Sequence, residues 1–207
     1  NNIKRTLSLP GYFTLILNIP RVSLKNEEYK VPNKIKDLQK THKFIINYCH
    51  KDEGPITKLL PNLRNPLVHD DDYIIIIDDD IVYKKYIFVC LINGLYKNPN
   101  NIVTMCNSSI EGFKGFAFVK KTLRNLNNLN IPKSCIRIDD DVIQTWVKKK
   151  NISVTKIPYK FNFNLFRPRS FCSLEESKTN THPKWDELKF DNREPMVKQC
   201  LQDLKIL

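Results

Sequence analysis

Glycine is scarce in this chain, with five residues in 207, and long apolar runs are missing. The glycines form neither a GxGxxG sequence nor a Walker A loop, which argues against a dinucleotide-binding fold and a P-loop fold. No apolar stretch approaches the roughly 18 residues needed to cross a bilayer, so we expect no membrane span. Residues 12–19 are apolar but too short for a secretory signal, so we expect none.

Metal-type cysteine spacing is also missing. None of the six cysteines forms a CxxC pair, so we do not expect a zinc site. Several lie within apolar runs, where a free cysteine behaves as a small hydrophobic residue. We therefore predict six free, structural thiols and a reducing, cytoplasmic setting. These residues are Cys49, Cys90, Cys106, Cys135, Cys172 and Cys200.

Acidic residues are fewer than basic ones: 22 Asp and Glu face 34 Lys and Arg, for a formal net charge of +12. This excess favours anionic partners such as nucleotides, nucleic acids or acidic membranes. Because no ladder of alternating aromatic and basic residues is present, we do not expect a nucleic-acid partner. The length and the 41% hydrophobic content suit one globular domain with its own core.

The most informative feature is the sequence Tyr-Ile-Ile-Ile-Ile at 73–77, followed by three aspartates. Consecutive β-branched residues predict a strand buried on both faces. Asp78, Asp79 and Asp80 would then lie at the carboxyl end of that strand, where open α/β sheets bind ligands. Three adjacent carboxylates suit a hard divalent cation. A solvated acidic turn is the alternative.

The rest of the chain alternates between expected strands and helices, which predicts an α/β fold. We expect strands at residues 12–17, 43–49, 102–106 and 152–157, and helices at 84–96, 122–129 and 142–150. A second triplet, Asp139, Asp140 and Asp141, precedes the last of these helices. An aspartate in this place is often only a helix N-cap. Residues 158–207 are predicted to be an irregular tail with a final helix.

Four segments, in order, resemble the GT-A glycosyltransferases, especially one bacterial and viral branch. They are the Gly-Pro-Ile-Thr-Lys sequence at 54–58, the Asp-Asp-Asp-Ile-Val-Tyr sequence at 78–83, the glycine-containing segment 112–119, and the Asp-Asp-Val sequence at 140–142. The Lys-, Asn- and Ile-rich composition resembles that of large DNA viruses such as chloroviruses. The resemblance implies one GT-A domain with a mostly parallel central sheet. Its core would span 1–157, with a tail or lid at 158–207.

The resemblance also implies roles for individual residues. Mn²⁺ or Mg²⁺ and a UDP-sugar would be the cofactor and donor, and Asp141 of the second triplet lies where inverting members keep a catalytic base. His182 and Lys184, in the expected tail, would add a metal ligand and a charge for the diphosphate. The implied set comprises Asp140 and Asp141 for catalysis, Asn18, Ile19, Arg21, Lys58, Asp78, Asp79 and Lys184 for the nucleotide, and Asp78, Asp80 and His182 for the metal.

We therefore predict a metal-dependent glycosyltransferase that moves a sugar from a UDP-sugar to a hydroxyl of a glycan acceptor. We expect a cytoplasmic monomer, in the host cytoplasm if the protein is viral. Two alternatives stay open. A nucleotidyltransferase also uses paired aspartates and a metal, although residues 17–20 lack its glycine-rich loop. A non-catalytic nucleotide-binding module would need neither acidic triplet.

Overall fold

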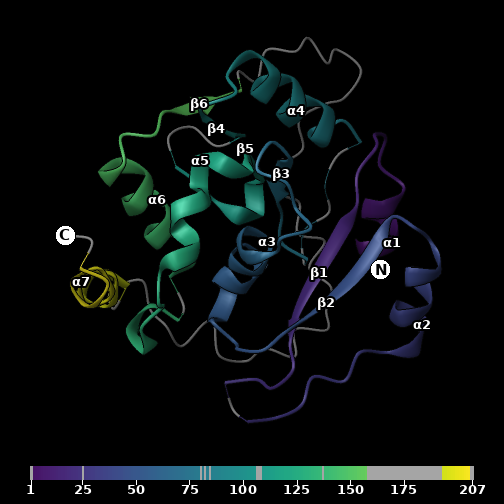
Figure 1. The fold of residues 1–207 in the computed structure, drawn as a ribbon, viewed down its shortest axis with the longest axis horizontal. Helices are drawn as coiled ribbons and strands as arrows, with labels where there is room; N and C mark the ends of the chain where they lie inside the picture. Colours follow the sequence, from purple (N-terminus) through teal and green to yellow (C-terminus); the bar gives the residue numbers. More distant parts are fainter. Residues whose placement is uncertain are drawn as a thin grey trace.

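The computed structural model describes residues 2–24, 26–79, 81, 83, 85–105, 109–136, 138–157 and 193–205. It has the mixed α/β architecture that the sequence predicts (Figure 1). Its elements are α1 (Asn2–Leu7), β1 (Leu15–Pro20), α2 (Asn33–Lys36), β2 (Phe44–Cys49), α3 (Leu60–Arg64), β3 (Tyr73–Ile76), α4 (Ile87–Lys97), β4 (Ile102–Thr104), β5 (Phe116–Val119), α5 (Lys120–Leu123), α6 (Asp139–Lys149), β6 (Val154–Lys156) and α7 (Arg193–Asp203).

The described strands form two sheets. Strands β1 and β2 pair in parallel, and β3, β5, β4 and β6 form a second sheet in that order. In the second sheet β5 runs antiparallel to both β3 and β4, whereas β4 and β6 are parallel. Where we expected one mostly parallel sheet, the described strands therefore form two sheets, of which the larger is mixed. The difference arises from β5, which follows the glycines of segment 112–115 and returns the chain alongside β3.

Strand β3 packs against apolar residues on both faces, and Ile74 and Ile76 are buried while Ile75 on the opposite face is half-buried. Ile74 and Ile76 belong to one hydrophobic cluster, which also contains residues of α3 and α6. Ile75 and Ile77 pack against a second cluster, to which Leu91 of α4 contributes. Helix α4 thus covers one face of the four-stranded sheet, and α3 and α6 cover the other. This packing fixes the direction in which the chain leaves β3.

Helix α6 begins at the second acidic triplet. Ile138 is the N-cap residue, and no side-chain hydrogen bond caps the helix, so the aspartates do not serve as a cap. Asp139, Asp140 and Asp141 instead form the first turn, where negative charge interacts favourably with the helix dipole. The helix was expected to start at Val142, so the expected boundary is three residues too late.

One expectation about the cysteines is wrong. Cys135 and Cys200 form a disulfide whose Cα atoms lie 4.8 Å apart, joining α7 to the 3-10 helix Lys133–Cys135. A separation of 65 residues gives no signal in the sequence, because only the packing of α7 brings the two thiols together. Cys49 and Cys90 are free, as predicted, while Cys106 and Cys172 lie outside the described residues.

Within the described ranges, no helix is both long and apolar enough to cross a membrane.

A glycine anchors the segment between β2 and α3. Gly54 has φ +75°, and a Cβ on it would lie 2.1 Å from the carbonyl oxygen of Ile136. Gly11 also has a positive φ, of +128°, but its nearest neighbour, Phe13, would be 3.8 Å from a Cβ. A side chain at position 54 would therefore have both a strained backbone conformation and a collision with the backbone of Ile136. A side chain at position 11 would have the strained conformation alone.

We predict that Gly54→Ala lowers the free energy of unfolding by about 3–5 kcal/mol, because the overlap adds to the strain. The matched variant Gly11→Ala should lose less, about 1–2 kcal/mol. Urea unfolding of both variants measures the difference. Equal losses would show that the contact between Gly54 and Ile136 does not constrain the fold.

Candidate active site

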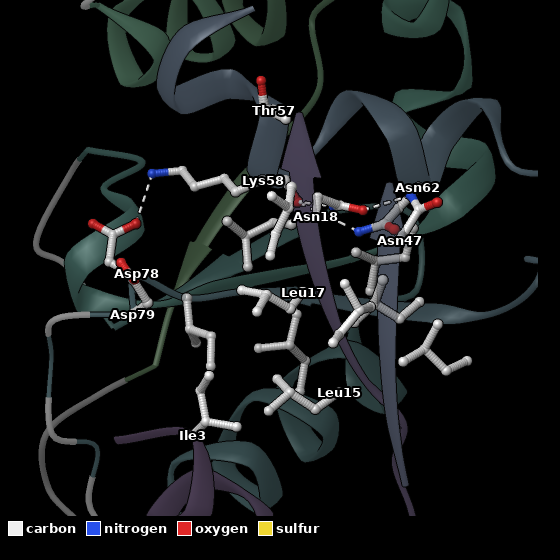
Figure 2. Close-up of a pocket in the computed structure, with 18 of the residues that line it drawn as sticks. Ile3, Leu15, Leu17, Asn18, Asn47, Thr57, Lys58, Asn62, Asp78 and Asp79 are labelled. Atoms are coloured by element: carbon white, nitrogen blue, oxygen red, sulfur yellow. Dashed lines mark hydrogen bonds and ion pairs between the residues drawn. The ribbon is translucent and has the colours of Figure 1, made fainter. Parts of the chain in front are cut away.

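The first acidic triplet meets a lysine at the end of β3. Lys58 Nζ lies 2.8 Å from Asp78 Oδ1 and 2.8 Å from Asp139 Oδ2. Asp140 Oδ1 is 3.9 Å from the same nitrogen. Figure 2 shows the Lys58 side chain extending toward Asp78. Carboxylates from β3 and from α6, about sixty residues apart in sequence, thus surround one ammonium group.

The backbone of Lys58 is held in place from the β1 side. Lys58 ends the 3-10 helix Gly54–Lys58, and its carbonyl oxygen accepts hydrogen bonds from Asn18 Nδ2 at 3.2 Å and Asn62 Nδ2 at 3.4 Å. Asn47 of β2 in turn donates to Asn18 Oδ1 at 2.7 Å. The three amides lie together on one side of Lys58 in Figure 2. Asn18 therefore links the carboxyl end of β1 to the root of the Lys58 side chain.

An ion pair between the buried Glu53 and the exposed Arg64 holds the start of the same segment. Glu53 is 5% exposed, and its carboxylate oxygens lie 2.6 Å and 3.2 Å from the two Nη atoms of Arg64. Arg64 also donates to the carbonyl oxygens of Asn127 and Leu129. The two-pronged contact with Arg64 compensates the buried carboxylate of Glu53. It fastens residues 53–64, and so Lys58, to the rest of the chain.

Gly112 approaches the lysine closely. A Cβ on Gly112 would lie 2.2 Å from Lys58 Nζ and 2.8 Å from Asp78 Oδ1, so a side chain there would displace the ammonium. The Gly112 amide donates to Asp140 Oδ1 at 3.2 Å. Tyr83, 5% exposed, accepts a hydrogen bond from the Asp78 amide at 2.8 Å and donates to the Gly112 carbonyl at 3.3 Å. Tyr83 thereby ties the two chain segments together.

The charges shift one another's protonation. Burial alone would lower the pKa of Lys58, but Asp139, Asp78 and Asp140 outweigh it and hold that pKa above its ordinary range. Burial, followed by the charge of Asp139, raises the pKa of Asp140 to about 6, although Lys58 and the Gly112 amide act in the opposite direction. The site therefore holds a permanently charged ammonium beside a carboxyl group that titrates near neutral pH.

An open cavity of about 2450 Å³ borders this cluster. Its polar part contains Asn18, Lys58, Asp78 and Asp140, and its apolar part is lined by residues of β1 and β3. Figure 2 shows Ile3, Leu15 and Leu17 in the apolar part. The cavity is large enough for a nucleotide with an attached sugar, and its anion-binding ammonium lies on one wall.

The structure brings most of the predicted site residues together, but not all. Asn18, Ile19, Lys58, Asp78, Asp79 and Asp140 line the cavity. The Asp79 side chain is exposed, and its carbonyl oxygen accepts a hydrogen bond from Asn2. Arg21 is exposed and Asp141 half-buried, and neither is among the residues that line the cavity. Asp80, His182 and Lys184 lie outside the described residues.

Sequence reasoning missed other members of the site. Asp139 was seen only as part of a triplet, yet it is the carboxylate of that triplet closest to Lys58. Tyr83 and Gly112 belong to segments that were recognised without a role for either residue. The short spacing between Asp78 and Tyr83 was a usable signal, because two residues so close in sequence can readily bring the phenol to the Asp78 amide.

The carboxylates are chemically suited to a divalent cation. Carboxylate oxygens are the donors that Mg²⁺ and Mn²⁺ prefer, and one ammonium facing three carboxylates leaves negative charge uncompensated. Within the described part of the chain, no three Asp, Glu, His or Cys side chains stand together as a ligand set. Asp78 and its neighbour Asp80, if they bind a metal as predicted, would do so beside Lys58.

Comparison with known proteins adds no family assignment. No protein-family model matches this chain, and its sequence matches no curated protein.

The raised pKa of Asp140 predicts a pH effect on stability. The folded protein binds this proton more tightly than the unfolded chain, so the contribution of Asp140 to stability falls as pH rises from about 4 to about 6. Asp140→Asn removes this titration. Relative to wild type, the variant should gain about 1–3 kcal/mol in unfolding free energy across that window. Urea unfolding in EDTA at several pH values tests this, and a difference that stays constant with pH would contradict it.

Proposed function

We propose that this protein is a metal-dependent glycosyltransferase that transfers a sugar from a UDP-sugar to a hydroxyl group of a glycan acceptor. One observation carries the proposal. Lys58, Asp78, Gly112 and Asp140 come from the four separate segments that resemble GT-A enzymes, and they meet in one cluster beside the cavity. Nothing in their sequence positions requires them to meet.

The positions around the cavity suggest how a donor would bind. Asn18 and Ile19, at the carboxyl end of β1, line the cavity where the nucleoside would lie. Lys58 would supply a positive charge for the diphosphate, because its raised pKa keeps it protonated. A UDP-sugar carries both groups that these residues would recognise. On the same grounds, we propose that the chain folds as a single GT-A domain.

We assign the role of general base to Asp140. It lines the cavity, whereas Asp141 is not among the lining residues. A base is most effective when its pKa lies near the working pH, and the pKa of Asp140 is raised to about 6. Asp140 would take the proton of the acceptor hydroxyl as that oxygen attacks the anomeric carbon of the sugar. The Gly112 amide would orient the carboxylate for this step.

Asp78 would hold Mn²⁺ or Mg²⁺ together with Asp80, and the metal would stabilise negative charge on the departing diphosphate. Lys58 would act on the same charge. The further ligand His182 and the cation Lys184 remain part of the proposal as the resemblance implies them.

A donor screen tests the proposed function. Purified protein is incubated with Mn²⁺, a mixed glycan acceptor and each nucleotide sugar in turn, and released nucleotide is measured. We expect release from a UDP-sugar, with Asp78→Asn lowering the rate by about 100-fold. The matched control Asp37→Asn removes an exposed carboxylate that pairs with the exposed Lys40, and should keep the wild-type rate.

Two outcomes would overturn the proposed function. No release from any nucleotide sugar, with folded protein, would exclude the activity under these conditions. Release of pyrophosphate from a nucleoside triphosphate and a sugar phosphate would favour a nucleotidyltransferase.

A further inference from the structure

The Lys58 ammonium occupies the place where the acidic side chains converge. Its nitrogen lies 2.8 Å from oxygens of Asp78 and Asp139, and the side chain is 20% exposed. We propose that Lys58 is the resident cation of this site in the metal-free protein, and that it leaves Asp78 when a divalent cation binds there. The inference rests on the proposed function, because it takes Asp78 to be a metal ligand.

Competition for one oxygen follows from the contacts. Asp78 Oδ1 accepts the hydrogen bond from Lys58 at 2.8 Å. A metal ion bound to the same carboxylate would be a second positive charge within a few ångströms of the ammonium, and like charges at such distances repel by several kcal/mol in a partly buried site. The two cations therefore exclude each other at Asp78 unless the ammonium moves.

The surroundings of Lys58 permit that movement. The carbonyl oxygen of Lys58 is fixed by Asn18 and Asn62, so the root of the side chain stays in place. The stem of lysine has four rotatable bonds, and the cavity lies beside it. The ammonium can therefore turn from Asp78 into the cavity, where the diphosphate of a bound nucleotide would receive it.

The chain segments that carry the carboxylates also make contacts that do not involve the ammonium. The Asp78 amide donates to the Tyr83 hydroxyl, and the Asp140 carboxylate accepts from the Gly112 amide. These contacts hold the backbone at Asp78 and the carboxylate of Asp140 when the ammonium turns away, and the bound divalent cation would then supply the positive charge. A permanent structural ion pair is the competing explanation, and it predicts that removing Lys58 weakens or leaves unchanged the binding of a metal.

Manganese binding without nucleotide distinguishes these explanations. Free Mn²⁺ is titrated by electron paramagnetic resonance against wild type and Lys58→Met. We expect the variant to bind Mn²⁺ at least about tenfold more tightly, because the competing charge is gone. Lys121→Met is the matched control, since Lys121 pairs with Asp71 on the surface and its loss changes the net charge equally. Equal or weaker binding by Lys58→Met would overturn the inference.

A second measurement uses the wild-type protein alone and does not depend on the variant folding. Lysines are acylated briefly and the modified sites are read by mass spectrometry. Lys58 should react slowly in EDTA, several-fold faster with Mn²⁺, and slowly again with Mn²⁺ and UDP. A rate at Lys58 that does not change on adding saturating Mn²⁺ would overturn the inference.

These readouts separate the inference from the proposed function. If Lys58→Met binds Mn²⁺ more tightly but no nucleotide sugar is turned over, the displacement of Lys58 stands and the glycosyltransferase proposal fails. If UDP-sugars are turned over and Mn²⁺ affinity is the same with and without Lys58, the proposed function stands and the displacement is wrong. If neither the wild type nor Lys58→Met binds Mn²⁺, the inference is wrong.

Discussion

The arrangement depends on one constraint: the carboxylates that follow β3 and begin α6 lie close together only with a positive charge among them, and in this structure Lys58 supplies it. Three carboxylates at the edge of a core would repel one another and lose hydration, so they require a cation among them. Lys58 meets this need only because its backbone is fixed. Gly54 allows the turn before it, the Glu53–Arg64 pair anchors the segment, and Asn18 holds the carbonyl.

The same constraint connects the two sheets. Asn18 lies in the second half of β1 in one sheet, Asp78 follows β3 in the other, and Lys58 forms hydrogen bonds with both. One lysine residue therefore reaches from β1, through its carbonyl oxygen, to the segment after β3, through its ammonium group. Strands β1 and β3 both line the cavity, but they belong to different sheets and do not pair with each other. The polar cluster thus marks the end of an apolar cavity, which is the arrangement that ligand sites commonly have.

Local pattern predicted strand β3 and helix α4. The run at 73–77 was expected because its side chains are β-branched, and α4 was expected as an apolar helix that packs on the sheet. The strand β5 was not expected, because its identity depends on pairing with β3 and β4 rather than on its own sequence. The Cys135–Cys200 disulfide was missed for the same reason, since it depends on where α7 packs.

The site was predicted at the level of segments more than of side chains. Successive residues of a helix point about 100° apart, so which aspartate of 139–141 faces Lys58 depends on where α6 begins. The sequence placed that start at Val142, and the cap is Ile138. Asp141 was therefore favoured as the base, although Asp140 lines the cavity. Gly112 was missed as a contact because close approach of backbone to an ammonium leaves no mark in sequence other than a glycine.

The location of metal binding tests the account most directly. Substoichiometric Mn²⁺ added to ¹⁵N-labelled protein broadens the amide signals nearest to its site. We predict that the signals of Asp78, Gly112 and Asp140 broaden first, and more strongly when UDP is present. The acidic turn at 70–72 serves as an internal comparison, because its carboxylates Asp70 and Asp71 already pair with Arg124 and Lys121. Broadening centred on that turn, or on no particular site, would contradict the account.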